Sequence, residues 1–77
     1  MPLDLRQMRH VIALDKHGSF ARAASALGLS QSALSRSIQS VEREIGSDLF
    51  VRTASGVEPT DGGRIFIALF ATVLGAA

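Results

Sequence analysis

Apolar residues recur every three or four positions along most of the first 45 residues, the spacing that places side chains on one face of an α-helix. The pattern predicts helices over residues 3–16, 20–27 and 31–45. A glycine stands one or two residues after each segment, where a left-handed conformation commonly ends a helix. Ser19 and Ser30 precede the second and third segments and are predicted N-caps, because a hydroxyl can accept a hydrogen bond from a free amide of the first turn.

Each predicted helix contributes one apolar stripe to the core. The second helix is short and rich in alanine, which allows it to cross its neighbours closely over a tight turn. The predicted core positions are Leu5, Met8, Val11, Ile12, Leu14, Phe20, Ala23, Ala24, Leu27, Leu34, Ile38, Val41 and Ile45. A short helix, a tight turn and a longer helix form the layout of a helix-turn-helix.

The segment after this motif has the pattern of a short hairpin. Residues 48–53 predict one strand, and residues 54–56 predict a turn. Val57 and Glu58 are the predicted return strand, and Pro59 closes the segment because it has no amide hydrogen to donate to a ladder. Two such strands beside a helix-turn-helix would make a wing, so the predicted class is a mainly α-helical winged helix-turn-helix.

A fourth helix is predicted to start near Asp61, with Thr60 as its N-cap. Apolar residues cover most of its circumference, which a surface helix of a monomer does not show. We therefore expect a second copy of the chain to pack against this helix and form a homodimer. The predicted dimerisation residues are Ile65, Phe66, Leu69, Phe70 and Val73. No clear helix stop precedes the end of the sequence, and we expect the chain to be truncated.

The composition is that of one small domain without covalent cross-links. The 77 residues carry no cysteine, so neither a disulfide nor a cysteine-bound zinc ion can stabilise the fold. The charged N-terminus lacks the apolar core of a signal peptide, and no apolar run reaches the length that a bilayer requires. We expect a cytoplasmic protein that does not contact a membrane.

The charges are distributed unevenly, although their sum is only +1. No acidic residue occurs from Lys16 to Val41, a stretch that also contains Arg22 and Arg36. The side of the third helix opposite its apolar stripe carries glutamine, serine and arginine, which are donors and acceptors that reach base edges or phosphates. A helix with these properties fits the major groove of DNA.

Four motifs in order along the chain carry a family resemblance. They are LRQM (residues 5–8), GSFARAASALGLSQSALSRSIQSVEREIG (18–46), LFVR (49–52) and PTDGG (59–63). In this order and spacing they resemble the N-terminal domain of the LysR-type transcriptional regulators. Basic residues that are frequent in the family are absent here at Ser55 in the wing and at Gln39 and Ser40 in the third helix, and Ser32 replaces a common proline.

The resemblance implies both an architecture and partners. Residues 1–59 would form the winged helix-turn-helix, and residues 60–77 would begin a linker helix that pairs two subunits. A C-terminal domain that binds a small-molecule effector would be absent from this chain, which itself would hold no cofactor. The whole regulator would act on double-stranded promoter DNA as a dimer of dimers.

The third helix, over residues 31–45, is the predicted recognition helix for sequence-specific DNA binding. Arg36 is the leading candidate, because its guanidinium can bind guanine O6 and N7 together or hold a phosphate; the alternative is a solvated surface arginine. The other candidates on this helix are Gln31, Ser32, Ser35 and Gln39. They lie in its N-terminal and central turns, the part of a recognition helix that enters the groove.

Other candidates are predicted to meet the phosphate backbone. Arg52 follows the first wing strand, and a salt bridge to Glu42 or Asp48 is the alternative for its side chain. Ser19 and Ser30 are caps first, although a helix N-terminus also presents amides to a phosphate. Further phosphate candidates are Arg22 and Thr60.

Two other functions remain open at this point. One is a protein-interaction module built on the fourth helix, and the other is a monomeric winged helix of another regulator family. An enzyme is not expected, because His10 and His17 have no carboxylate arranged as a partner and no serine has a histidine and an acid in a suitable pattern. The same absence argues against a metal site.

Overall fold

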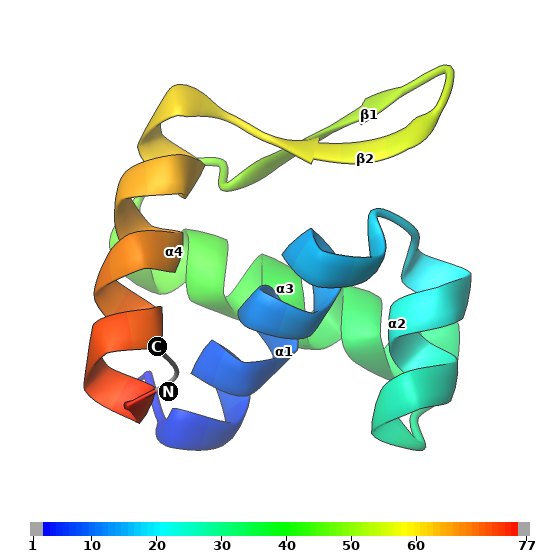
Figure 1. Ribbon diagram of the computed structural model, residues 1–77, viewed down its shortest axis with the longest axis horizontal. Coiled ribbons are helices and arrows are strands. Elements are labelled where there is room, and N and C mark those ends of the chain that lie inside the picture. Colours follow the sequence, from blue (N-terminus) through cyan, green and yellow to red (C-terminus); the bar gives the residue numbers. More distant parts are fainter. Residues whose placement is uncertain (1–2, 76–77) are drawn as a thin grey trace.

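The computed structural model describes residues 3–75, which form four helices and one two-stranded antiparallel sheet (Figure 1). In chain order the elements are α1 (Leu5–His17), α2 (Phe20–Leu27), α3 (Gln31–Ile45), β1 (Phe50–Thr53), β2 (Gly56–Pro59) and α4 (Asp61–Leu74). This order confirms the predicted winged helix-turn-helix followed by a further helix.

Side chains at the N-caps determine where the helices begin. The hydroxyls of Ser19, Ser30 and Thr60 each accept a hydrogen bond from the amide three residues later, at 3.2, 3.0 and 2.9 Å. Helix α1 starts two residues later than predicted because Asp4 caps it, its carboxylate accepting from the amide of Gln7 at 2.8 Å. The Gln7 side chain accepts in return from the Asp4 amide, which completes a capping box.

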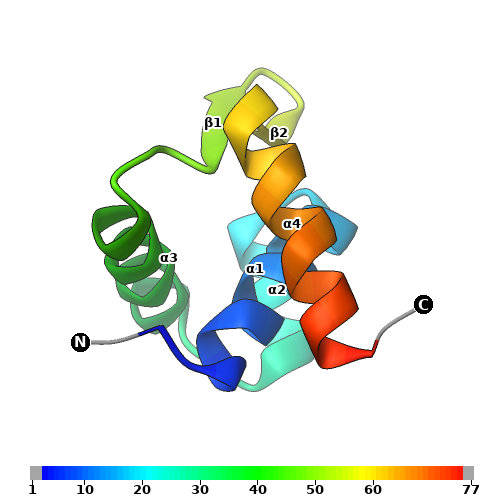
Figure 2. The same ribbon diagram turned by 90° about the vertical axis from the view of Figure 1, so that its left-hand side faces the viewer.

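Helix α1 is the centre of the fold. It contacts α2, α3, α4 and β2, and Figure 2 shows it between α3 and α4. The buried apolar core takes residues from the four helices and the wing segment: Val11, Leu14, Ala23, Ala24, Leu34, Ile38, Val41, Leu49, Val57 and Phe70. The core therefore joins the helix-turn-helix, the wing and α4 into one unit.

One predicted core position is wrong. Leu5 is 49% exposed. A helix turns about 100° per residue, so the nine positions from Leu5 to the buried Leu14 make about two and a half turns and place the two side chains about 180° apart. Leu5 therefore lies on the opposite side of α1 from the stripe that enters the core.

The wing is a hairpin in which Phe50 pairs with Pro59 and Thr53 pairs with Gly56. Strand β1 is shorter than the predicted segment 48–53, because Leu49 leaves the hairpin and is fully buried in the core. Strand β2 is longer than predicted at both ends. Pro59 is tolerated because it is the last residue of the strand.

A backbone hydrogen bond fixes the wing on the turn between α1 and α2. The amide of Val57 donates to the carbonyl of Gly18, in the turn between α1 and α2, at 3.0 Å. Gly56 has a φ of +134°, and a Cβ on this residue would lie only 2.3 Å from the same carbonyl oxygen. Glycine at position 56 thus allows the hairpin to approach the turn closely.

The other end of the wing is held by α3. The Glu42 carboxylate accepts from the amide of Leu49 at 2.7 Å, and the carbonyl of Leu49 accepts from the amide of Thr60 at 2.9 Å. Leu49, just before β1, is thus hydrogen-bonded both to α3 and to the N-cap residue of α4.

Helix α4 has a stop that the sequence reading overlooked. Gly75 adopts a left-handed conformation, with φ of +69°, and its amide bonds to carbonyls of the last turn. The expectation of an uncapped helix end was therefore wrong. Of the predicted linker segment 60–77, residues 76–77 lie outside the described residues, as do residues 1–2 of the predicted domain 1–59.

Candidate nucleic-acid interface

Helix α3 has an apolar side and a polar side. Leu34, Ile38 and Val41 are buried in the core. The opposite side carries the predicted recognition residues: Gln31, Ser32, Arg36 and Gln39 are exposed and Ser35 is half-buried. The packing of the core thus turns all five of these side chains away from the body of the domain, where a partner can reach them.

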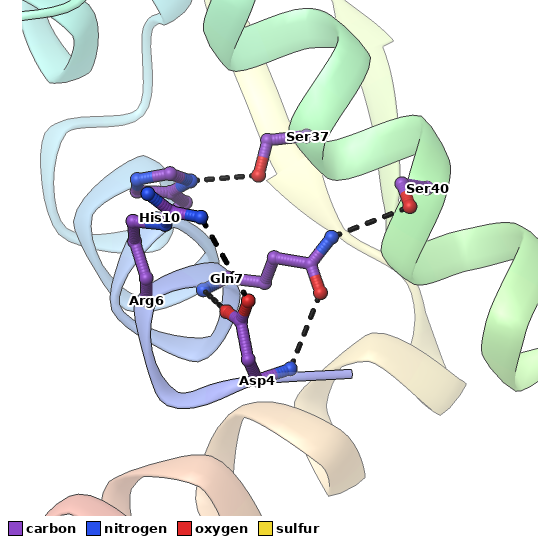
Figure 3. A network of polar contacts seen from close by, with 6 residues as sticks. All are labelled: Asp4, Arg6, Gln7, His10, Ser37 and Ser40. Atoms are coloured by element: carbon purple, nitrogen blue, oxygen red, sulfur yellow. Dashed lines mark hydrogen bonds and ion pairs between the residues drawn. The ribbon is translucent and has the colours of Figure 1, made fainter. Parts of the chain in front are cut away.

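A second polar side of α3 faces α1, and the sequence reading missed it. Ser40 Oγ accepts from Gln7 Nε2 at 3.3 Å, and Ser37 Oγ is hydrogen-bonded to His10 Nδ1 at 2.7 Å (Figure 3). In each helix the two partners are three residues apart, so they lie on one face. This matched spacing is the signal that could have predicted the contact.

His10 is the one buried polar or charged residue among residues 3–75. Burial, and then the nearby Arg6 guanidinium, lower the pKa of His10, and the Asp4 carboxylate opposes this shift. The ring is therefore uncharged at neutral pH, and its bond to Ser37 is made without burying a cation. The role of His10 is to hold α3 against α1.

Residues from α3, the wing and the start of α2 line a surface hollow of about 370 Å³. Its lining consists of Phe20, Gln31, Ser32, Ser35, Arg36 and Arg52. Five of these were predicted DNA-contacting residues, although Arg52 is 16 positions from Arg36 in the sequence. Gln39 lines an adjoining hollow that shares Phe20, Ser35 and Arg52 with the first.

The side chain of Arg52 lies over an aromatic ring. Its guanidinium carbon is 4.7 Å from the centroid of the Phe20 ring. Neither of the acids considered as alternative partners takes it: Glu42 is occupied by the Leu49 amide, and the ion pair found within residues 3–75 joins Arg6 to Asp4. The salt-bridge alternative for Arg52 is therefore not observed.

The remaining backbone candidates lie outside this hollow. The hydroxyls of Ser19 and Ser30 are engaged as caps of α2 and α3, as predicted. Arg22 is exposed on α2. These residues surround the start of the two helices of the motif, where first-turn amides point outward.

The predicted dimerisation residues on α4 fall into two groups that differ in their exposure. Ile65, Leu69 and Val73 are 63%, 53% and 58% exposed, and their spacing of four places them in one ridge. Phe70 is only 3% exposed and belongs to the core, with Phe66 packed against it. The prediction of Phe70 as an interface residue is corrected: it is buried in the core because it lies one position, about 100°, round the helix from Leu69.

Within residues 3–75, no three histidine, cysteine, aspartate or glutamate side chains are grouped so that they could hold a metal ion. In the same part of the chain, no helix has the length and apolar character needed to cross a membrane.

Comparison with known proteins decides the family. The model of the bacterial regulatory helix-turn-helix proteins of the lysR family matches residues 5–64, which include the helix-turn-helix, the wing and the start of α4. The chain belongs to the LysR family. This membership confirms the resemblance carried by the four motifs, and it identifies the chain as a DNA-binding domain of regulators and not of enzymes.

Curated relatives share this domain and are much longer. The SDS degradation transcriptional activation protein of Pseudomonas sp. is 53% identical over 64 residues, which cover 83% of this chain and 21% of that protein. The regulator TfdT of Cupriavidus pinatubonensis is 43% identical over 84% of this chain and 28% of its own length. The LysR-family chain thus spans about a quarter of these relatives.

Solved structures of LysR-family domains bound to DNA have the same fold. The DNA-binding domain in the CbnR complex with DNA matches with a TM-score of 0.90 and 32% identity, covering 95% of this chain and 84% of that chain. The BenM domain bound to benA site 1 DNA also has a TM-score of 0.90, with 34% identity over 95% of this chain and 82% of that chain.

Proposed function

We propose that this LysR-family domain binds double-stranded DNA sequence-specifically, with the N-terminal half of α3 in the major groove and the wing on the phosphate backbone. The continuous polar face of α3 carries the proposal. It is exposed, contains no acid from Gln31 to Val41, and continues into Arg52 of the wing. Phosphates beside this part of α3 would therefore meet neutral or positive side chains, and Glu42, which lines the adjoining hollow, accepts a hydrogen bond from the Leu49 amide.

The proposed DNA-contacting residues have two roles. Arg36 is proposed to read a guanine through O6 and N7, since it is exposed at the rim of the hollow between α3 and the wing. Gln31, Ser32, Ser35 and Gln39 are proposed to contact neighbouring bases. Arg52 and Arg22 are proposed phosphate ligands, together with the helix N-termini at Ser19 and Ser30.

Assembly is a second part of the proposal. The ridge of Ile65, Leu69 and Val73 is proposed to pair two subunits, because three large apolar side chains in one line are left uncovered by the domain. Pairing would present two copies of α3 to two half-sites. One similar structure is full-length CbnR in complex with its target DNA, and this supports the placement of such a domain within a larger regulator.

The properties of the whole regulator are proposed from its relatives. These are transcriptional regulators several times longer than this chain. We propose that the protein regulates transcription from promoter DNA in the cytoplasm, as a dimer that forms tetramers. A small-molecule effector would bind a part that this chain does not include.

The test is a fluorescence-anisotropy titration with DNA selected by the 77-residue chain from random duplexes. Arg36→Ala should cost about 1–3 kcal/mol of binding free energy and relax the preference at one base pair. Arg43→Ala, on the same helix but closer to its C-terminal end, is the matched control and should leave base preference unchanged. If Arg36→Ala retains both the affinity and the sequence preference, this role for α3 is wrong.

A further inference from the structure

The wing arginine and the first residue of α2 form a contact that joins two separate parts of the domain. The Arg52 guanidinium lies 4.7 Å from the centroid of the Phe20 ring, within the range of a cation–π interaction. Figure 1 shows the hairpin extending across the molecule toward the start of α2. Both side chains line the two hollows beside the recognition helix.

The choice of partner affects the charge that Arg52 can offer. A carboxylate would neutralise the guanidinium and would repel an incoming phosphate. An aromatic ring attracts the cation through its face and leaves the charge and the in-plane N–H donors available. Glu42, one of the two acids considered as a salt-bridge partner of Arg52, instead accepts a hydrogen bond from the amide of Leu49 at 2.7 Å.

We propose that Phe20 is a positioning residue for DNA binding. Its ring holds the Arg52 guanidinium at the edge of the hollow beside α3, ready to bind one backbone phosphate next to the bases that α3 reads. A long, exposed arginine loses rotamer freedom when it binds a phosphate, and prior placement on the ring reduces that loss. The inference rests on the proposed DNA-binding function and adds what holds the Arg52 side chain in place for a phosphate.

A double-mutant cycle tests the proposal with the 77-residue chain and the DNA duplex that it selects. Phe20→Leu should weaken binding about two- to five-fold, the range of an exposed cation–π contact. Arg52→Ala should make the negative slope of log affinity against log salt less steep by about one. The double variant should bind no more weakly than Arg52→Ala alone, and Phe20→Tyr should restore the wild-type affinity.

Arg64 provides a matched control, because it is an exposed arginine on α4, across the molecule from α2 in Figure 1. The effects of Phe20→Leu and Arg64→Ala should simply add. Additive effects of Phe20→Leu and Arg52→Ala would overturn the proposal, as would an unchanged affinity of Phe20→Leu.

A second variant separates the ring's charge distribution from its packing. Pentafluorophenylalanine at position 20 keeps the shape of the ring but reverses its quadrupole. It should weaken DNA binding when Arg52 is present and have no effect on binding in the Arg52→Ala variant. The melting temperature of the fluorinated protein should equal that of the protein with natural phenylalanine. Equal affinities of the fluorinated and natural Arg52 proteins would refute the positioning role. Failure of the wild-type chain to select any sequence would instead refute the proposed function.

Discussion

Adjacent residues of α4 are expected to respond in opposite ways to substitution. Phe70 is 3% exposed and packs in the core, whereas Leu69 is 53% exposed on the outer ridge. Phe70→Ala should therefore destabilise the domain itself. Leu69→Glu should leave the domain folded and prevent the pairing of two subunits.

The magnitude follows from the burial. A phenylalanine that buries about 150–250 Å² contributes roughly 4–6 kcal/mol at about 25 cal/mol per Å². Core Phe→Ala substitutions cost about 3–5 kcal/mol. A domain of 77 residues is stable by only about 4–12 kcal/mol, so Phe70→Ala should remove roughly a quarter or more of its stability. An exposed Leu69→Glu should change the stability of a monomer by about 0.5 kcal/mol or less.

Two measurements distinguish these outcomes. Urea unfolding followed by circular dichroism gives the stability of each variant, and sedimentation velocity at several protein concentrations gives its association. Phe70→Ala should shift the unfolding midpoint strongly downward, while Leu69→Glu should retain the midpoint measured for dilute wild-type protein and sediment as a monomer. A Phe70→Ala protein as stable as the wild type would refute the packing, and a dimeric Leu69→Glu protein would refute the ridge as the subunit contact.

Two further predictions concern contacts inside the domain. The lowered pKa of His10 means that the folded state binds fewer protons than the unfolded state, so its contribution to stability is complete above about pH 6.5 and is lost as the pH falls through the lower folded-state pKa. Replacement of His10 by Gln, which can still hydrogen-bond to Ser37, should flatten the dependence of unfolding free energy on pH between pH 7.5 and 5; an unchanged slope would contradict this account. Gly63→Ala should destabilise the domain severely, because a Cβ there would lie 2.0 Å from the carbonyl oxygen of Leu49. Gly62→Ala is the control and should be neutral or stabilising by up to about 1 kcal/mol, since its Cβ meets nothing closer than 3.5 Å; equal melting temperatures of the two variants would show that α4 does not approach Leu49 so closely.

The helices were predictable because their signals are local. The periodicity of three and four, the N-cap hydroxyls and the glycines after each helix are all set by neighbours along the chain. The polar face of α3 followed from the same periodicity, since the residues that enter the core leave the others outside. The family motifs added the wing and the expectation of DNA binding.

The sequence was least informative where a residue had several possible partners. The apolar surface of α4 did not reveal which side chains would enter the core, and Phe70 was wrongly assigned to a second copy. For Arg52 the sequence left a salt bridge to Glu42 or Asp48 open as the alternative to a phosphate contact, and in the structure its guanidinium lies on the ring of Phe20. The Glu42 carboxylate instead satisfies a buried amide at Leu49.

Local spacing and capping were thus sufficient for the helix-turn-helix and its polar recognition face, because these features depend on contacts within a few residues. The packing of distant segments assigned the partners. It placed Phe20 beneath Arg52, joined His10 to Ser37, and divided α4 between a buried phenylalanine and an exposed ridge. Such contacts depend on which surfaces exclude water together in three dimensions, and this competition is settled only when all the helices and the wing have packed.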